Sequence, residues 1–134
     1  MRRTFATAAV LALSLSACGG TTSNSDSKFK GEQQEVVKVV DALAKAGSRG
    51  DADKICNEIL AKQLVTELKS AGGDCVTEMD RAISDASDYD LQVTSVKVNG
   101  TNATARVRQG DHGEVATFTF VKEGSAWRAS ALGG

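Results

Sequence analysis

Apolar residues recur at helical spacing in the first half of the chain. Between residues 32 and 46 one apolar stripe is made by Val36, Val39, Val40 and Leu43, and widened by Val37 and Ala44. A stripe with a period near 3.6 residues predicts an amphipathic helix that packs on a core. The run Gly-Ser-Arg-Gly at residues 47–50 predicts its end.

A second helical segment follows Asp51, which is a natural N-cap. Its apolar face is made by Ile55, Cys56, Ile59 and Leu60. The helical period then continues through Leu64, Val65 and Leu68 to an Ala-Gly-Gly stop at residues 71–73. This continuation is either an extension or, after a kink near Ala61, a separate helix, and we favour the kink.

A third helix is predicted at residues 75–86, with Asp74 as its cap and Val76, Met79 and Ile83 on one face. Cys75 begins this helix and Cys56 lies in the one before it. In an oxidising compartment we expect a disulfide between them, closing a loop that stabilises the fold by about 3 kcal/mol. Two free thiols, or a redox or metal pair, are the alternatives.

The pattern changes to β after Tyr89, because apolar and polar residues now alternate. Turn signals at Asn99-Gly100, at residues 110–113 and at Glu123-Gly124 separate four strands. These strands are predicted at residues 91–98, 103–108, 115–121 and 126–132. In the first strand the apolar face switches after Val93, which predicts a bulge near Ser95 and a strongly curved sheet.

Helices followed by a meander predict an α+β domain, with N-terminal helices packed on a curved antiparallel four-stranded meander. Residues 32–132 resemble the nuclear transport factor 2-like superfamily, whose curved sheet wraps a helical layer into a cone. The resemblance rests on the opening helix, the hairpin series, the helix start Gly50-Asp51-Ala52-Asp53 and the final strand Gly124-Ser125-Ala126-Trp127-Arg128.

The N-terminus resembles that of bacterial lipoproteins. A basic start, Met1-Arg2-Arg3, precedes about 12 mainly apolar residues from Phe5, too few to span a bilayer of about 30 Å. Leu15-Ser16-Ala17-Cys18 matches the lipobox, which implies cleavage before Cys18 and acylation of its thiol. The alternative is ordinary cleavage with Cys18 left as a free thiol.

Three regions follow from this resemblance. Residues 1–17 are the expected signal peptide, residues 18–31 carry the lipidated Cys18 on a Ser/Thr/Gly-rich flexible tether, and residues 32–134 form the domain. The protein is therefore expected at the cell membrane, lipid-anchored and facing the extracytoplasmic side. Arg2-Arg3-Thr4-Phe5 leaves general-secretory and twin-arginine export both open.

Charge and composition limit the classes of partner and cofactor that we expect for this protein. After removal of residues 1–17 the formal charge is −3, from 14 basic and 17 acidic residues, which argues against nucleic acid. Few aromatic residues remain to build the core. A small core gives limited stability, so the expected disulfide would add to it. The sequence holds no metal-binding or cofactor motif, so we assign no cofactor and no metal.

Candidate site residues are few, and none is assigned as catalytic. Tyr89, between Asp88 and Asp90, is the best acid/base cluster, although a solvated junction between helix and strand also explains it. His112 falls in a predicted turn. The candidate pocket consists of Tyr89, Phe118, Phe120 and Trp127, with Trp127 also a natural core residue. A basic patch formed by Arg106, Arg108 and Arg128 competes with an ordinary polar sheet face.

These features favour a lipid-anchored domain that binds a protein partner or a small apolar ligand without catalysis. The superfamily resemblance implies an alternative, a small-molecule isomerase or dehydratase that uses carboxylates, Tyr or His inside the cone. A dimer formed through the sheet is a third hypothesis, and it requires an exposed apolar sheet face.

Overall fold

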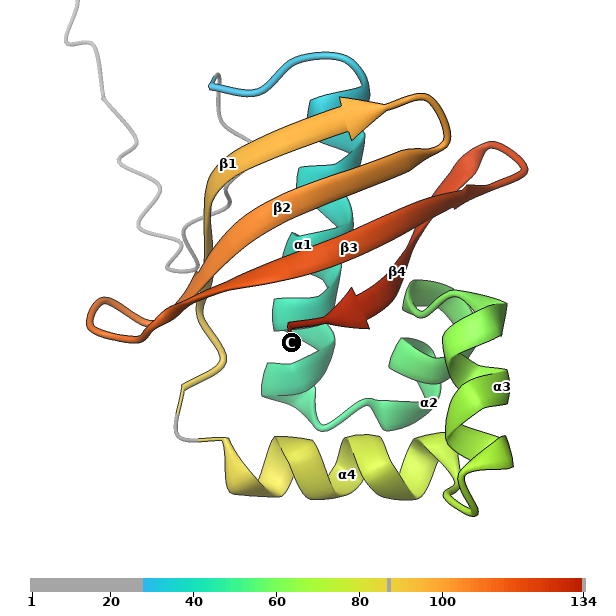
Figure 1. Ribbon diagram of the computed structural model, residues 1–134. Coiled ribbons are helices and arrows are strands. Elements are labelled where there is room, and N and C mark those ends of the chain that lie inside the picture. The colour runs from blue at the N-terminus through green and yellow to red at the C-terminus, as the bar shows by residue number, and fades with distance from the viewer. Residues whose placement is uncertain (1–27, 87, 134) are drawn as a thin grey trace, which may run out of the picture.

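The computed structural model describes residues 28–86 and 88–133, and it places a helical layer on one face of an antiparallel sheet (Figure 1). The helices are α1 (Glu32–Arg49), α2 (Ala52–Lys54), the π-helix η1 (Ile55–Ile59), α3 (Lys62–Ser70) and α4 (Cys75–Asp85). The strands are β1 (Leu91–Asn99), β2 (Asn102–Gln109), β3 (Val115–Glu123) and β4 (Ala126–Leu132). The predicted α+β class is confirmed. The signal peptide, Cys18 and the tether up to residue 27 lie outside the described residues.

The four strands form a meander in the order β1-β2-β3-β4, as the three turn signals predicted. Gly100 turns the first hairpin with a φ of 63°, a conformation that suits glycine. The register of β1 against β2 shifts between Val93 and Ser95, which confirms the predicted bulge. Because of this shift, Val93 and Val96 both face the helices. The register of β3 against β4 also shifts, between Thr119 and Phe120, and the sequence pattern did not predict this second shift.

The core lies between α1 and the inner face of the sheet. Val36, Val37 and Val40 of α1 are completely buried. In the register of β2 and β3, Ala103 lies opposite Phe120 and Ala105 opposite Phe118. The two small alanine side chains lie beside the two aromatic rings and leave room for the valines of α1. Large and small side chains therefore fill the space between α1 and the sheet together.

The favoured kink near Ala61 predicted an interruption of the helix after Ile59. The structure shows a full separation into two helices, with non-helical residues between them. Leu60 and Ala61 are extended. Leu60 pairs in parallel with Ala129, and the Ala61 N–H donates to the Ala129 carbonyl at 2.8 Å. This short segment therefore covers the edge of β4, which would otherwise expose unpaired backbone groups.

The opposite sheet edge, β1, is capped by side chains. The Thr94 carbonyl accepts a hydrogen bond from Lys28 Nζ at 3.4 Å, and the Val96 carbonyl accepts one from Gln33 Nε2 at 3.2 Å. Beside them Phe29, which falls within the expected tether of residues 18–31, is buried in the core. The packed domain thus begins before residue 32, because burial of one aromatic ring orders the chain that carries it.

The start of α1 is tied to the end of the sheet by Glu32. Its carboxylate accepts hydrogen bonds from Lys122 Nζ, at 2.8 Å, and from the indole N–H of Trp127. The side-chain hydrogen bond from Lys122, followed by that from Trp127, holds the pKa of Glu32 below its ordinary value. This cluster anchors α1 to β3 and β4 at the end of the sheet away from α4 (Figure 1).

A disulfide joins the helices that follow α1. Cys56 in η1 is bonded to Cys75 at the first position of α4, and both are buried. Asp74 caps α4 by accepting a hydrogen bond from the Thr77 N–H at 3.2 Å. Within residues 28–86 and 88–133, no helix is both long and apolar enough to cross a membrane.

Candidate functional site

An apolar pocket of about 140 Å³ lies between α1, α4 and the strand ends and is partly open to solvent. Its lining is almost entirely hydrophobic, and polar groups come only from Tyr89 and Gln109. The lining residues are Leu43, Ala44, Gly47, Ile55, Met79, Ala82, Ile83, Ala86, Tyr89, Leu91, Gln109 and Leu132. An enclosed apolar cavity of roughly 150 Å³ takes up benzene or xenon. This pocket has a similar volume and an apolar lining but opens to solvent, so its size suits a small hydrocarbon group.

Small residues on two helices create the space. Ala44 and Gly47 of α1 lie across from Ala82 and Ala86 at the end of α4. Larger side chains at these four positions would fill the gap between the helices. Gly47 is so placed that an added Cβ would lie 3.5 Å from Cδ1 of Tyr89, in ordinary contact.

The outer wall, α4, is held at its two ends. The disulfide at Cys75 fixes its first turn to η1. Near its last turn, the Tyr89 hydroxyl donates a hydrogen bond to the Ile83 carbonyl at 2.8 Å. Cys75 is the single fully buried residue of α4, so most of this helix lies over the pocket instead of deep in the core.

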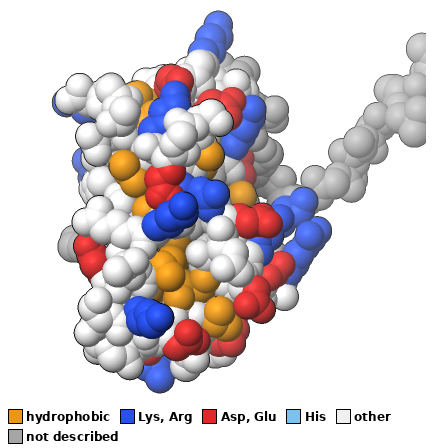
Figure 2. Space-filling model, turned by 90° about the vertical axis from the view of Figure 1, so that its right-hand side faces the viewer, with side chains coloured by type: hydrophobic (Ala, Val, Ile, Leu, Met, Phe, Trp, Pro, Cys, Tyr) orange, Lys and Arg blue, Asp and Glu red, His pale blue; other side chains and the backbone are white. Residues whose placement is uncertain are grey.

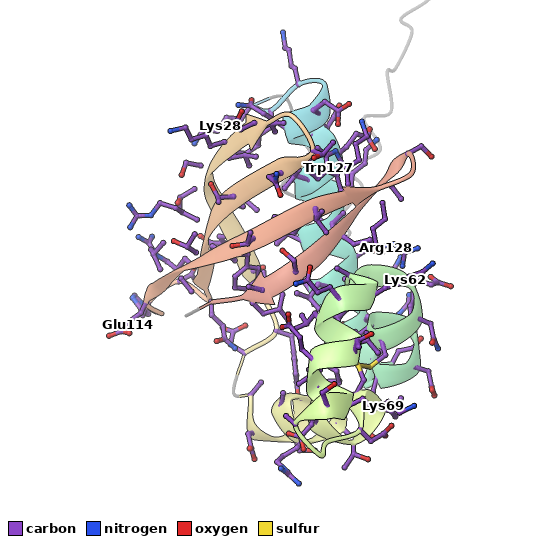
Figure 3. All side chains as sticks on the ribbon, turned by 45° about the vertical axis from the view of Figure 1, so that its right-hand side comes forward. Lys28, Lys62, Lys69, Glu114, Trp127 and Arg128 are labelled. Carbon is purple, nitrogen blue, oxygen red and sulfur yellow. A yellow bond between two sulfur atoms is a disulfide. The ribbon has the colours of Figure 1, made fainter. Side chains whose placement is uncertain are left out.

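Tyr89 is the one member of the predicted pocket that lines it. Phe118, Phe120 and Trp127 do not line this pocket; they are buried in the core, where each is at most 8% exposed. Figure 3 shows Trp127 near the start of α1, at the end of the sheet away from α4. The sequence signal for the true lining is the pair of small residues on each helix.

The predicted acid/base cluster is not assembled around the pocket. The Asp88 carboxylate accepts a hydrogen bond from the Asp90 N–H at 2.9 Å, which shapes the entrance to β1. Gln109 Nε2 donates to the Asp88 carbonyl at 2.7 Å. Neither Asp88 nor Asp90 lines the pocket, and His112 is exposed in the turn between β2 and β3. Tyr89 is therefore the one titratable side chain in the pocket wall.

The three arginines of the predicted basic patch do not come together. Arg106 and Arg108 share the face of β2 that points away from the helices. Arg128 lies two strands away, and its guanidinium donates to the Asn57 carbonyl at 3.1 Å. In Figure 3 it lies beside Lys62 at the start of α3.

The side of the molecule that carries α3 mixes hydrophobic and charged side chains (Figure 2). No residue of α3 is fully buried, and Leu64, Val65 and Leu68 pack against the core while half-buried. In the described part of the chain, no three His, Cys, Asp or Glu side chains are grouped so that they could hold a metal ion.

Comparison with known proteins gives no relative from which a role could be transferred: no family model, no curated protein and no solved structure matches this chain.

Proposed function

We propose that the protein is a lipid-anchored domain on the extracytoplasmic side of the cell membrane, where it binds a small apolar ligand without catalysis. The observation that carries the binding part of this proposal is the apolar pocket between α1 and α4. The lipobox at residues 15–18 supports the anchor. Ligand sites are typically concave and hydrophobic with a few polar groups at defined positions. Tyr89 and Gln109 are those polar groups here.

The finer fold assignment belongs to the same proposal: we propose that the domain is a nuclear transport factor 2-like cone. Its support is the bulged sheet together with the helix α1 packed across its inner face. The pocket lies at the end of this cone where α4 crosses the strand ends. A non-catalytic role is favoured over an isomerase or dehydratase because the Tyr89 hydroxyl already donates to the Ile83 carbonyl.

Filling the pocket tests the binding function. We expect benzene to bind the wild-type chain saturably, with NMR shifts of amides such as those of Gly47 and Ala82. In Ala44→Leu the added methylenes occupy the space that benzene would take, so its affinity should fall at least about tenfold. The NMR titration measures both.

Ala71→Leu makes the same change at an exposed position after α3 and should bind benzene as the wild type does. Two results would contradict the pocket: shifts that never saturate in the wild-type chain, or equal affinity in Ala44→Leu.

The anchor is tested by labelling in a bacterial host. We expect the wild-type chain to incorporate a clickable palmitate analogue and Cys18→Ser to incorporate none, because the acyl chains are attached through that residue. Two chains at about 0.8 kcal/mol per buried CH₂ hold a protein stably on a membrane. Ser25→Ala, a change in the tether, should keep the label. A labelled Cys18→Ser chain, or an unlabelled wild type, would remove the anchor from the proposal.

A further inference from the structure

The face of the sheet that points away from the helices is basic on β1 and β2. Lys97, Arg106 and Arg108 occupy outward positions there, with Lys97 opposite Thr104 and Arg106 opposite Ser95. Lys97 and Arg106 are exposed. None of the three takes part in the four ion pairs found among the described residues. We call these three residues the basic sheet face.

Carboxylates lie at the two ends of this face instead of within it. Asp90 and Asp111 both accept hydrogen bonds from Gln92 Nε2, at the end of the sheet near Arg108. Glu123 lies at the end of β3 and accepts a hydrogen bond from the Lys62 N–H at 3.2 Å. The positive charge of Lys97 and Arg106 is therefore left uncompensated by any side chain between these ends.

The chain leading to Cys18 joins the domain beside the basic sheet face. Lys28, the first described residue, reaches the Thr94 carbonyl on the edge strand β1, next to Ser95. It adds a fourth cation at this edge. Nine residues, 19–27, lie between it and Cys18, so the two are at most about 36 Å apart along the chain. A lipid on Cys18 would thus keep this part of the sheet within reach of the membrane.

The helical layer carries the opposite sign. Residues 32–86 contain 7 basic and 11 acidic side chains. Lys38, Lys54 and Arg81 of this layer are paired with glutamates one helical turn away. An anionic surface would therefore attract the sheet side of the domain and repel the helical side.

We propose that the basic sheet face docks onto the anionic phospholipid headgroups of the membrane that holds the anchor. This inference rests on the proposed anchor, which brings the domain to that surface. Each Lys or Arg near an anionic membrane strengthens binding about fivefold. Docking orients the domain with β1 and β2 toward the bilayer and the helices away from it.

The test uses the mature chain, residues 18–134, coupled through Cys18 to a maleimide lipid in vesicles. Cys56 and Cys75 are disulfide-bonded, so Cys18 is the single free thiol. Chemical coupling makes the test independent of acylation in the cell, which the palmitate label reports separately. Trp127, the one tryptophan, serves as the energy donor and a dansyl headgroup as the acceptor.

We expect more energy transfer in vesicles that contain phosphatidylglycerol than in phosphatidylcholine vesicles. This difference should shrink from about 0.1 M to about 1 M salt, where the Debye length falls from about 10 Å to about 3 Å. In Lys97→Glu/Arg106→Glu the ratio of docked to undocked domains should fall at least about 25-fold, since two contacts of about fivefold each are lost.

The matched control is Lys45→Glu/Lys69→Glu, which changes the net charge equally at exposed positions of α1 and α3. It should keep the dependence on phosphatidylglycerol. Equal transfer in the two kinds of vesicle would overturn the proposal and leave the basic sheet face to an acidic protein partner. Equal losses in the two double variants would overturn it as well, since net charge alone would then explain the attraction.

Discussion

Phe120→Ala is expected to lower the free energy of unfolding by about 3–5 kcal/mol. Phe120 is the largest of the completely buried side chains, at 1% exposed. Its neighbours across the sheet are Ala103 on β2 and Ala129 on β4. Alanines cannot extend into the space that the ring vacates, so a cavity remains and its cost adds to the lost burial.

Denaturant unfolding followed by Trp127 fluorescence measures this loss, with the disulfide intact in both chains. Since small domains are stable by about 5–15 kcal/mol, the variant should unfold at a much lower denaturant concentration. Thr117→Ala, on the outer face of the same strand, is the control and should change stability by less than about 0.5 kcal/mol. A loss below about 1 kcal/mol in Phe120→Ala would mean that the core collapses around the missing ring.

The order of helices and strands could be predicted because each has a periodic apolar pattern of its own. The bulge in β1 was also visible, since Val93 and Val96 are both apolar although a regular strand would point them to opposite faces. These features depend on residues close in sequence. The pairing of Leu60 with Ala129 could not be predicted in this way, because it joins positions that no local pattern links.

Of the residues that line the pocket, Tyr89 is the one that was predicted from the sequence as a pocket residue. Periodicity identifies which side of an element faces the core, and Phe118 and Phe120, two positions apart in β3, lie on the same buried side. It does not say where along the core the side chains fail to fill the space. That depends on α4 crossing the strand ends, which brings Ala82 and Ala86 opposite Ala44 and Gly47. Phe29 was missed for a related reason, since one aromatic in a polar segment has no period.

Removal of the disulfide by Cys56→Ala/Cys75→Ala is expected to destabilise the domain by about 3 kcal/mol and to loosen α4 first. The bond closes a loop between residues 19 positions apart, and opening it increases the entropy of the unfolded chain. In the folded chain α4 has no other fully buried residue than Cys75. Its remaining links, such as the hydrogen bond from Tyr89 to Ile83, are then too few to hold the helix on the pocket.

Hydrogen exchange distinguishes this outcome from a uniform loss of stability. Amides of α4 should exchange faster than those of β2 and β3 in the double variant, because α4 opens locally while the sheet stays folded. In Phe120→Ala, by contrast, all protected amides should lose protection together. Benzene affinity should fall in the cysteine variant as well, since α4 forms one wall of the pocket. Unchanged protection of α4 would show that the helix is held by packing alone, and the pocket would then owe nothing to the disulfide.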